Sequence, residues 1–221
     1  ALVSGAVRDA SDEHVARTIA AIVEGLRARG HELKLVRPRQ GTADRAQQAR
    51  GFGEMLRPGI PIPRYSQLRM GLPSGRALMQ AWQRSRPDIV HIATEGPLGW
   101  SALSAARALG LPVATDFRTN FGAYSSHYGF GWIAPAVTAY LRAFHNRADC
   151  TMVPTEEMAL ALARQGFQNL RVVGRGVDTS AFTPSRRDPA RRQFWCARDD
   201  VPVALCVSRF GPEKNFPLVF D

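Results

Sequence analysis

Short apolar segments alternate along this chain with longer segments whose apolar residues recur at helical spacing. The clearest pair is DIVHIA at residues 88–93, typical of a buried strand, followed by the helical pattern PLGWSALSAARALG at residues 97–110. The same patterns predict strands at 31–36, 112–117, 150–155 and 170–176, and helices at 15–29, 74–87, 132–146 and 156–166. Strands and helices alternating at this interval are typical of a doubly wound parallel sheet, so we expect an α/β fold.

Residues 38–73 interrupt this alternation, because they are rich in Pro and Gly. The segment RPGIPIPRY at residues 57–65 has too many prolines for a central strand, since proline cannot donate a ladder hydrogen bond. We therefore expect this stretch to be mainly loop.

Ligands of a doubly wound sheet bind outside the carboxyl ends of the strands, where helix N-termini present unpaired N–H groups. The candidate segments follow the expected strands, at residues 4–10, 94–99, 118–124 and 154–157. They contain neither the glycine pattern of dinucleotide sites nor that of P-loops. The sequence also lacks HExxH, GxSxG and a metal-spaced histidine cluster, so it predicts chemistry that needs no such motif and no metal.

The chain is basic, with 29 Lys and Arg residues against 19 Asp and Glu, a formal net charge of +10. This balance favours polyanionic partners such as nucleic acid, anionic lipid surfaces or phosphorylated small molecules. The densest basic segment, SRRDPARR at residues 185–192, has no interleaved aromatic residues. We interpret it as a polar linker or an exposed helical turn, and we expect no nucleic-acid binding.

The cysteines and the apolar segments of the sequence indicate the cellular compartment of the protein. Cys150, Cys196 and Cys206 have no CxxC spacing, which argues against a disulfide framework or a zinc site. The sequence has no signal-peptide pattern and no apolar stretch of the roughly 18 to 20 residues that span a membrane. We therefore expect a soluble, cytoplasmic protein.

A family resemblance rests on seven segments that occur in order: LRARGHELKLVRP, PGIPIPRYSQLRMGLP, RPDIVHIATEGPLGWSAL, TNFGAYSSHYG, FHNRADCTMVPT, GRGVDTSAFTPSRR and VSRFGPEKN. Together they resemble bacterial retaining glycosyltransferases of the GT-B fold, and within them the GDP-mannose-dependent α-mannosyltransferases that act on lipid or glycolipid acceptors. The resemblance implies two Rossmann-like domains that face each other across a cleft. It implies an acceptor-side N-terminal domain at residues 1–180, a linker at 181–200 and the start of a nucleotide-sugar-binding domain at 201–221.

The donor site implied by the resemblance lies in VSRFGPEKN, residues 207–215. Arg209 and Lys214 would hold the donor pyrophosphate, and Gly211 would shape the turn between them. Negative charge grows on the departing diphosphate, and fixed cations stabilise it without a metal. The implied substrate is thus a nucleotide sugar and no cofactor is expected. Without the resemblance, the segment would be an exposed strand end with two ordinary basic residues.

The cleft residues implied by the resemblance follow the strand at 112–117. Arg118 stands where related enzymes carry a histidine that hydrogen-bonds the transferred sugar. Because arginine stays protonated, Arg118 could donate to a phosphate or a sugar hydroxyl but could not act as a base. A salt bridge at a strand end is the alternative role. Thr119, Asn120 and Tyr124 match the family and would line the cleft.

Glu95 and Thr155 are two further candidates for the acceptor side of the cleft. Glu95 precedes a helix N-terminus, where the helix dipole alone favours a carboxylate. Its position also allows a contact with the acceptor. Thr155 fits a helix N-cap, which explains it without a ligand. His91 and His145 are interpreted as structural histidines.

Glu13 and His14 depart from the family, which carries Asn-Gly or Gly-Gly before the first helix. A carboxylate facing the donor diphosphate is electrostatically unfavourable, and a Cβ restricts the turn. A catalytically degenerate binding protein is therefore one alternative to an enzyme. A nucleotide-sugar epimerase on the same two-domain plan is another, although the cleft segments follow the transferase pattern.

The function that the sequence predicts is transfer of a hexose, mannose first, from a nucleotide diphosphate sugar to a lipid-linked or glycan hydroxyl with retention of configuration. The basic charge favours peripheral association with the inner face of a membrane. We expect these 221 residues alone to be inactive, because catalysis in this family requires both walls of the cleft.

Overall fold

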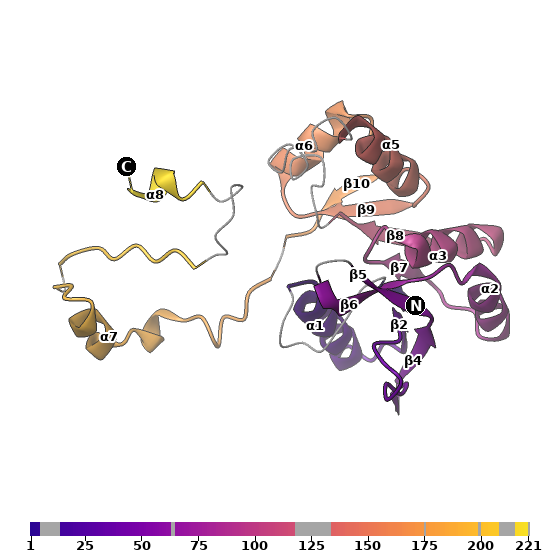
Figure 1. Ribbon diagram of the computed structural model, residues 1–221, viewed down its shortest axis with the longest axis horizontal. Helices are drawn as coiled ribbons and strands as arrows, with labels where there is room; N and C mark the ends of the chain where they lie inside the picture. Colours follow the sequence, from indigo (N-terminus) through magenta and orange to yellow (C-terminus); the bar gives the residue numbers. More distant parts are fainter. Residues whose placement is uncertain are drawn as a thin grey trace.

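The computed structural model describes residues 1–4, 14–62, 65–117, 134–174, 176–198, 200–207 and 215–220. Strands and helices alternate in the order β1 (Leu2–Val3), α1 (His14–Ala28), β2 (Leu33–Pro38), β3 (Gln48–Ala49), β4 (Phe52–Arg57), β5 (Gly59–Ile62), β6 (Tyr65–Gly71), α2 (Gly75–Arg84), β7 (Val90–Ile92), α3 (Pro97–Ala108), β8 (Val113–Asp116), α5 (Ala134–His145), β9 (Cys150–Val153), α6 (Glu156–Arg164) and β10 (Leu170–Val172). The 3₁₀ turn η2 (Pro184–Arg186) and helices α7 (Pro189–Phe194) and α8 (Pro217–Phe220) follow on a tail that extends away from the sheet (Figure 1).

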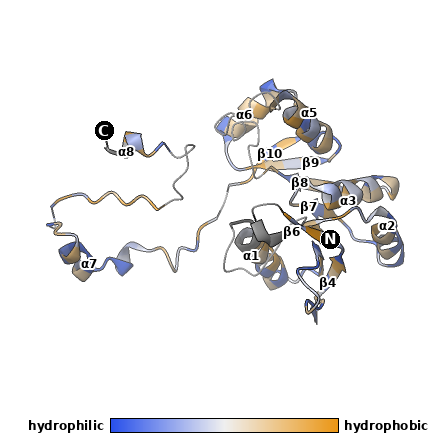
Figure 2. Cartoon of the chain, viewed as in Figure 1, coloured by the Kyte–Doolittle hydropathy of each residue, from blue (hydrophilic) through white to orange (hydrophobic). Residues whose placement is uncertain are grey.

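The main sheet has eight strands in the order β10-β9-β8-β7-β1-β2-β4-β3. Each neighbouring pair is parallel except β3 with β4, which is antiparallel. Strands of this sheet are among the most hydrophobic parts of the ribbon, whereas the helices carry hydrophilic and hydrophobic residues together (Figure 2). This is the composition expected of a parallel sheet that helices cover.

Two hydrophobic clusters lie on opposite faces of the sheet, because successive strand residues point to opposite sides. Val3 and Val36 belong to the cluster that α2, α3 and α5 cover, whereas Leu2 and Leu35 pack on the side of α1. The larger cluster also contains the fully buried residues Leu78, Trp82, Ile92, Leu98, Leu103 and Phe144. Burial of each such side chain contributes about 1.5–3 kcal/mol, so this face contributes most of the packing.

A third cluster packs α5 and α6 against the carboxyl ends of β8 and β9. It consists of Phe117, Leu141, Val153, Leu162 and Phe167. The amphipathic pattern at 156–166 thus has the expected core-facing side, while Leu160 on the same helix faces solvent.

The predicted alternation of strands and helices is confirmed, but the expectation of a loop at residues 38–73 is wrong. This stretch contains β3, β4, β5 and β6. β4 pairs in parallel with β2 over six residues, although it carries Gly53 and Glu54 at buried positions. The proline-dense segment lies outside the main sheet, in the two-stranded pair β5–β6, as its prolines require.

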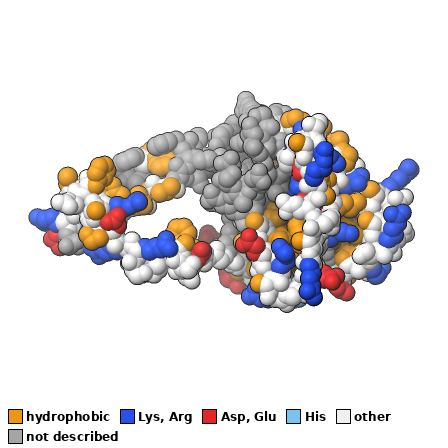
Figure 3. Space-filling view, turned by 90° about the horizontal axis from the view of Figure 1, so that it is seen from below, with side chains coloured by type: hydrophobic (Ala, Val, Ile, Leu, Met, Phe, Trp, Pro, Cys, Tyr) orange, Lys and Arg blue, Asp and Glu red, His pale blue; other side chains and the backbone are white. Residues whose placement is uncertain are grey.

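The carboxy-terminal tail exposes large hydrophobic side chains. Phe182, Phe194, Leu205 and Val207 are all more than 70% exposed. Hydrophobic side chains lie between basic ones on the tail in Figure 3. Residues 201–207, within the predicted start of a second domain, form neither helix nor strand. The domain boundaries at 180 and 200 stay predictions.

Among the described residues, no helix combines the length and the apolar content that crossing a membrane requires.

Leu103→Ala on α3 is expected to lower the free energy of unfolding by about 2–5 kcal/mol, because it leaves a cavity in a side chain site that is 1% exposed. Leu160→Ala on α6 is the matched control, since this side chain is 60% exposed and its loss should change stability by about 0.5 kcal/mol or less. Urea unfolding followed by circular dichroism measures both. Equal losses would contradict the assignment of the α3 face to the core.

Candidate functional site

The strand order creates a crevice at the carboxyl ends of β1 and β7. The chain leaves β1 toward β2 on one side and leaves β7 toward β8 on the other, so the direction of the crossovers reverses between these neighbouring strands. Ligands of open α/β sheets bind at such a reversal. Ser4 follows β1, and residues 94–96 lead from β7 into α3. The candidate site is built around these two strand ends.

Glu95 is the ionisable residue at the carboxyl end of β7, one residue before the N-cap Gly96 of α3. Its side chain is 12% exposed, and Oε1 lies 3.4 Å from Nε2 of His145. The hydroxyl of Tyr140 donates a hydrogen bond to the backbone oxygen of Glu95. Two side chains of helix α5 therefore contact Glu95: Tyr140 contacts the main chain of Glu95, and His145 contacts its carboxylate. A contact between this carboxylate and an acceptor stays a prediction.

His145 is fully buried at the end of α5. Its Nδ1 lies 2.9 Å from Oγ1 of Thr115, which lies 2.9 Å from Oγ1 of Thr151. The rings of Phe117 and Phe144 have their centres 5.3 and 5.2 Å from the imidazole. Burial and polar contacts agree with the interpretation of His145 as a structural histidine, and they add a link to Glu95 that the sequence pattern does not predict.

Two other local predictions can be compared with the structure. Thr155 caps α6 as predicted, and its Oγ1 accepts a hydrogen bond from the backbone N–H of Met158 at 3.2 Å. His91 lies half-buried in β7, with Nε2 3.8 Å from Oδ2 of Asp116 on the adjacent strand β8. Each residue thus has a structural role that accounts for its position.

Gly99 allows the connection from β7 to fold tightly onto α3. A Cβ at this position would lie 2.2 Å from the backbone oxygen of Thr94 and 3.2 Å from Cγ2 of Ile92. The carbonyl of Thr94 is main chain and cannot rotate away as a flexible side chain does. The second glycine of EGPLG therefore fixes the shape of the loop at the crevice.

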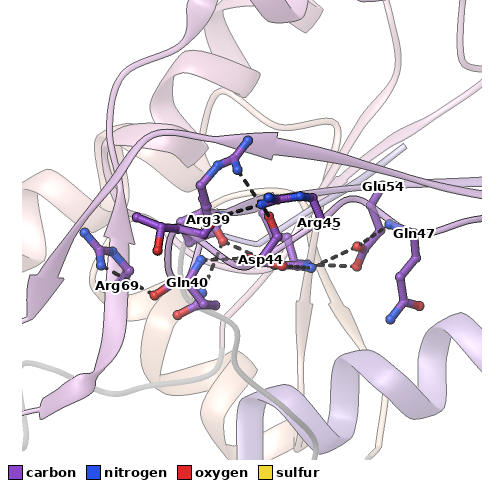
Figure 4. A network of polar contacts seen from close by, with 10 residues as sticks. Arg39, Gln40, Asp44, Arg45, Gln47, Glu54 and Arg69 are labelled. Carbon is purple, nitrogen blue, oxygen red and sulfur yellow. Dashed lines mark hydrogen bonds and ion pairs between the residues drawn. The ribbon is translucent and has the colours of Figure 1, made fainter.

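A charged network fixes the loop that follows β2, at the same edge of the sheet. The guanidinium of Arg37 donates to both oxygens of Asp44 at 2.7 and 3.0 Å and to both oxygens of Glu54 at 2.8 and 2.9 Å. The backbone N–H groups of Gln40 and Gln47 donate to the same two carboxylates (Figure 4). Paired bidentate contacts of this kind fix geometry as well as charge.

The network shifts the pKa values of its members. Burial lowers the pKa of Arg37, but the hydrogen bonds to Asp44 and Glu54 outweigh burial, so the net shift is upward. The hydrogen bond from Arg37 holds the pKa of Asp44 below its ordinary value of 3.8. The sequence pattern did not predict a role for these residues. The available signal was a charged residue inside each apolar strand, Arg37 in β2 and Glu54 in β4.

An apolar groove of about 450 Å³ lies between α2 and α3, beside the start of α3. Pro73, Met79, Pro97 and Trp100 form much of its wall. The guanidinium of Arg147 lies over the ring of Trp100, 5.1 Å from its centre. The groove thus combines apolar walls with a cation beside one of them.

Seven predicted site residues lie outside the described residues: Arg118, Thr119, Asn120, Tyr124, Arg209, Gly211 and Lys214. Glu13 also lies outside them, and His14 is the first residue of α1. The roles given to these residues stay predictions. Within the part of the chain that the structure describes, no group of three or more His, Cys, Asp or Glu residues could hold a metal ion.

Residues 15–181 match the family model for Glycosyltransferase Family 4. The chain is 32% identical over 203 residues to a GDP-mannose-dependent alpha-mannosyltransferase of Mycobacterium tuberculosis, covering 91% of this chain and 53% of the relative. It is 33% identical over 205 residues to a protein of the same name from Mycolicibacterium smegmatis, covering 91% of this chain and 54% of the relative. The chain therefore spans about half the length of these relatives.

The fold resembles that of sucrose-phosphate synthase from Thermosynechococcus elongatus, with a TM-score of 0.63 over 91% of this chain and 53% of that chain. The sequence identity is 13%, so the likeness concerns the fold alone. It supports the predicted GT-B type of α/β architecture.

Gly99→Ala is expected to lower the free energy of unfolding by about 1–3 kcal/mol, because the new methyl group overlaps the carbonyl of Thr94. Gly75→Ala at the start of α2 is the control, since the nearest atom to its Cβ is 4.0 Å away. Thermal unfolding of both variants checks the difference. A Gly99→Ala variant as stable as Gly75→Ala would contradict the tight packing of this loop.

The Arg37 network predicts that part of the free energy of unfolding depends on pH in the acidic range. Because the folded pKa of Asp44 is lowered, the stability that Asp44 contributes is present above its ordinary pKa of 3.8 and is lost as the pH falls through the lower folded value. The free energy of unfolding should therefore fall more steeply on acidification in the wild type than in Asp44→Asn. Urea titrations from about pH 5 to about pH 3 compare the slopes. Parallel curves would count against this contribution.

Proposed function

Since this chain belongs to glycosyltransferase family 4, we propose that the whole protein is a transferase that moves mannose from GDP-mannose to a hydroxyl of a lipid-linked or glycan acceptor, with retention of configuration. The observation that carries the proposal is the family match over residues 15–181 together with the two mannosyltransferase relatives. The names of these two relatives suggest the donor and the sugar. The sheet supplies a crevice at a topological reversal, where such folds bind ligands.

The proposed division of labour follows the two walls of the cleft. Residues 1–180 form the acceptor wall, residues 181–200 link the domains, and residues 201–221 begin the donor wall. Arg209 and Lys214 neutralise the diphosphate as it leaves, and Gly211 shapes their turn. Fixed cations of this kind are effective because they need no reorganisation when charge develops. The proposal includes no metal or other cofactor.

The acceptor side is proposed to use Arg118, Thr119, Asn120 and Tyr124 at the exit of β8. Arg118 donates hydrogen bonds and does not act as a base. The groove between α2 and α3 is compatible with the apolar part of a lipid acceptor. The net charge of +10 favours peripheral contact with an anionic membrane surface on the cytoplasmic side.

A binding protein that has lost catalysis is the second candidate. It is favoured by Glu13 and His14, which replace the Asn-Gly or Gly-Gly of related enzymes, and by Arg118, which replaces a histidine. This candidate predicts that a nucleotide sugar binds without being turned over. Isothermal titration calorimetry of the full gene product with GDP-mannose would detect this binding.

The experiment that tests the proposal measures mannose transfer from GDP-mannose by the full gene product that contains these residues, with a bacterial lipid extract as acceptor and UDP-glucose as the competing donor. Transfer is expected from GDP-mannose. Lys214→Ala should lower turnover by about 10² or more, the effect of removing one preorganised charge-stabilising group.

Lys34→Ala is the matched control, because Lys34 and Lys214 are the two lysines of the chain. Lys34 is exposed near the amino end of β2, at the edge of the sheet away from the crevice. Unchanged kcat/KM in Lys214→Ala would contradict the donor assignment. Binding without transfer would favour the degenerate relative, and preference for UDP-glucose would overturn the choice of donor.

A further inference from the structure

A buried ionisable pair lies at the crevice and has no role in the function proposed above. The Glu95 side chain is 12% exposed and the His145 side chain is completely buried, with Oε1 and Nε2 3.4 Å apart. Among the described residues, neither atom has a hydrogen-bonding partner, so the two atoms form a close polar contact and not a hydrogen bond. Burial of a carboxylate is unfavourable unless a partner compensates it, and His145 is that partner.

We infer that Glu95 and His145 are positioning residues for the acceptor: His145 on α5 holds the carboxylate of Glu95 and thereby fixes the connection from β7 to α3 at the crevice. This inference rests on the proposed transferase function. It gives Glu95 a different role from direct contact with the acceptor, because its carboxylate lies against a buried imidazole.

The polar chain behind His145 allows two arrangements of the ring proton, because Oγ1 of Thr115 can donate either to Nδ1 or to the backbone oxygen of Cys150, 3.4 Å away. Oγ1 of Thr151 lies 2.9 Å from Oγ1 of Thr115, which lies 2.9 Å from Nδ1 of His145. A hydroxyl can donate to a neutral ring nitrogen, and Nδ1 then accepts from Thr115. The ring proton is in that case on Nε2, the nitrogen that lies 3.4 Å from Oε1 of Glu95. Strands β8 and β9 thus orient the imidazole, and the imidazole orients Glu95.

Helix α5 holds the same connection at two more points. Tyr140 donates to the backbone oxygen of Glu95. The ring of Trp100, in the first turn of α3, packs on Tyr140 with centres 5.9 Å apart and on Phe144 at 5.2 Å. A shift of α5 would therefore move the N-terminus of α3 with it.

The position of α5 in the sequence links this clamp to the acceptor. The helix begins at Ala134, directly after residues 118–133, which include the predicted cleft residues. The same helix thus follows the segment that the proposal places on the acceptor side and contacts the connection from β7 to α3. Misplacement of a bound group by about 1 Å can cost on the order of 10²-fold in rate, so anchoring of this helix bears on turnover.

Ordinary packing does not require this pair. Buried polar or charged pairs can often be replaced by apolar residues of similar volume without loss of stability, whereas removal of His145 alone would leave the carboxylate of Glu95 without this polar neighbour. The aromatic residues around His145 would suit an apolar side chain, but such a residue would leave Oγ1 of Thr115 without its contact to Nδ1. The polar contacts with Glu95 and Thr115 are what an apolar residue could not supply.

The test uses the full gene product with GDP-mannose and a lipid extract, and compares Glu95→Ala, Glu95→Gln, His145→Ala and the double alanine variant. We expect each single alanine variant to raise the acceptor KM by about tenfold or more while the donor KM stays unchanged. The double variant should be no worse than the singles, because both act through one contact. Glu95→Gln keeps an oxygen for the Nε2–H and should retain most of the acceptor affinity.

Arg107→Gln is the matched control. It removes an exposed ion pair with Asp149, 3.2 Å long, from the last turn of the same helix α3. A general loss of α3 packing would affect this variant too, whereas the inference predicts a normal acceptor KM. An unchanged acceptor KM in Glu95→Ala, or an equal rise in Arg107→Gln, overturns the inference.

A readout without catalysis separates this inference from the proposed function. ¹⁵N spectra of the labelled imidazole should show the proton of neutral His145 on Nε2, and amide hydrogen exchange at residues 94–99 should speed up in Glu95→Ala but not in Arg107→Gln. If no transfer is detected, the proposed function fails. Amide hydrogen exchange at residues 94–99 then tests by itself whether His145 positions Glu95. Unchanged exchange in Glu95→Ala, or a proton on Nδ1, rejects the positioning pair. If His145→Ala does not fold, the Glu95 variants carry the same test.

Discussion

Parallel hydrogen bonding of the two-residue strand β1 to both β2 and β7 is the constraint on which the rest of the structure depends. Leu2 pairs with Leu35 on one side and with His91 on the other. Because parallel strands require right-handed crossovers, the two halves of the sheet must wind in opposite directions from this point. The crevice, the position of Glu95 and the N-terminus of α3 at its edge all follow from that reversal.

The fold was largely predictable because its signals are local. Apolar runs such as residues 88–93 and the helical period of 97–110 specify their own structure. The prediction was wrong at β4, because Gly53 and Glu54 interrupt the apolar pattern that is typical of a buried strand. Glu54 is tolerated in the sheet because Arg37 on β2 neutralises it, and that pairing exists only after the two strands are neighbours.

The candidate site was predictable in position but not in contacts. That Glu95 follows β7, and that Thr155 caps α6, could be inferred from adjacent residues. The contact of Glu95 with His145 joins positions 50 residues apart on different elements, and no spacing rule relates them. The tight approach of Gly99 to Thr94 is likewise a property of the folded loop, although the glycine itself marks a position where a side chain is excluded.

The central place of β1 also sets the order in which the sheet can assemble during synthesis. β1 precedes both of its partners, and it becomes an interior strand only after residues 90–92 have left the ribosome. Closing that long loop is slower and entropically less favourable than the earlier pairing with β2. Meanwhile its backbone groups toward β7 form an open edge that other chains could join. The nascent chain, rather than the finished sheet, is thus the stage at which this architecture most needs protection from aggregation.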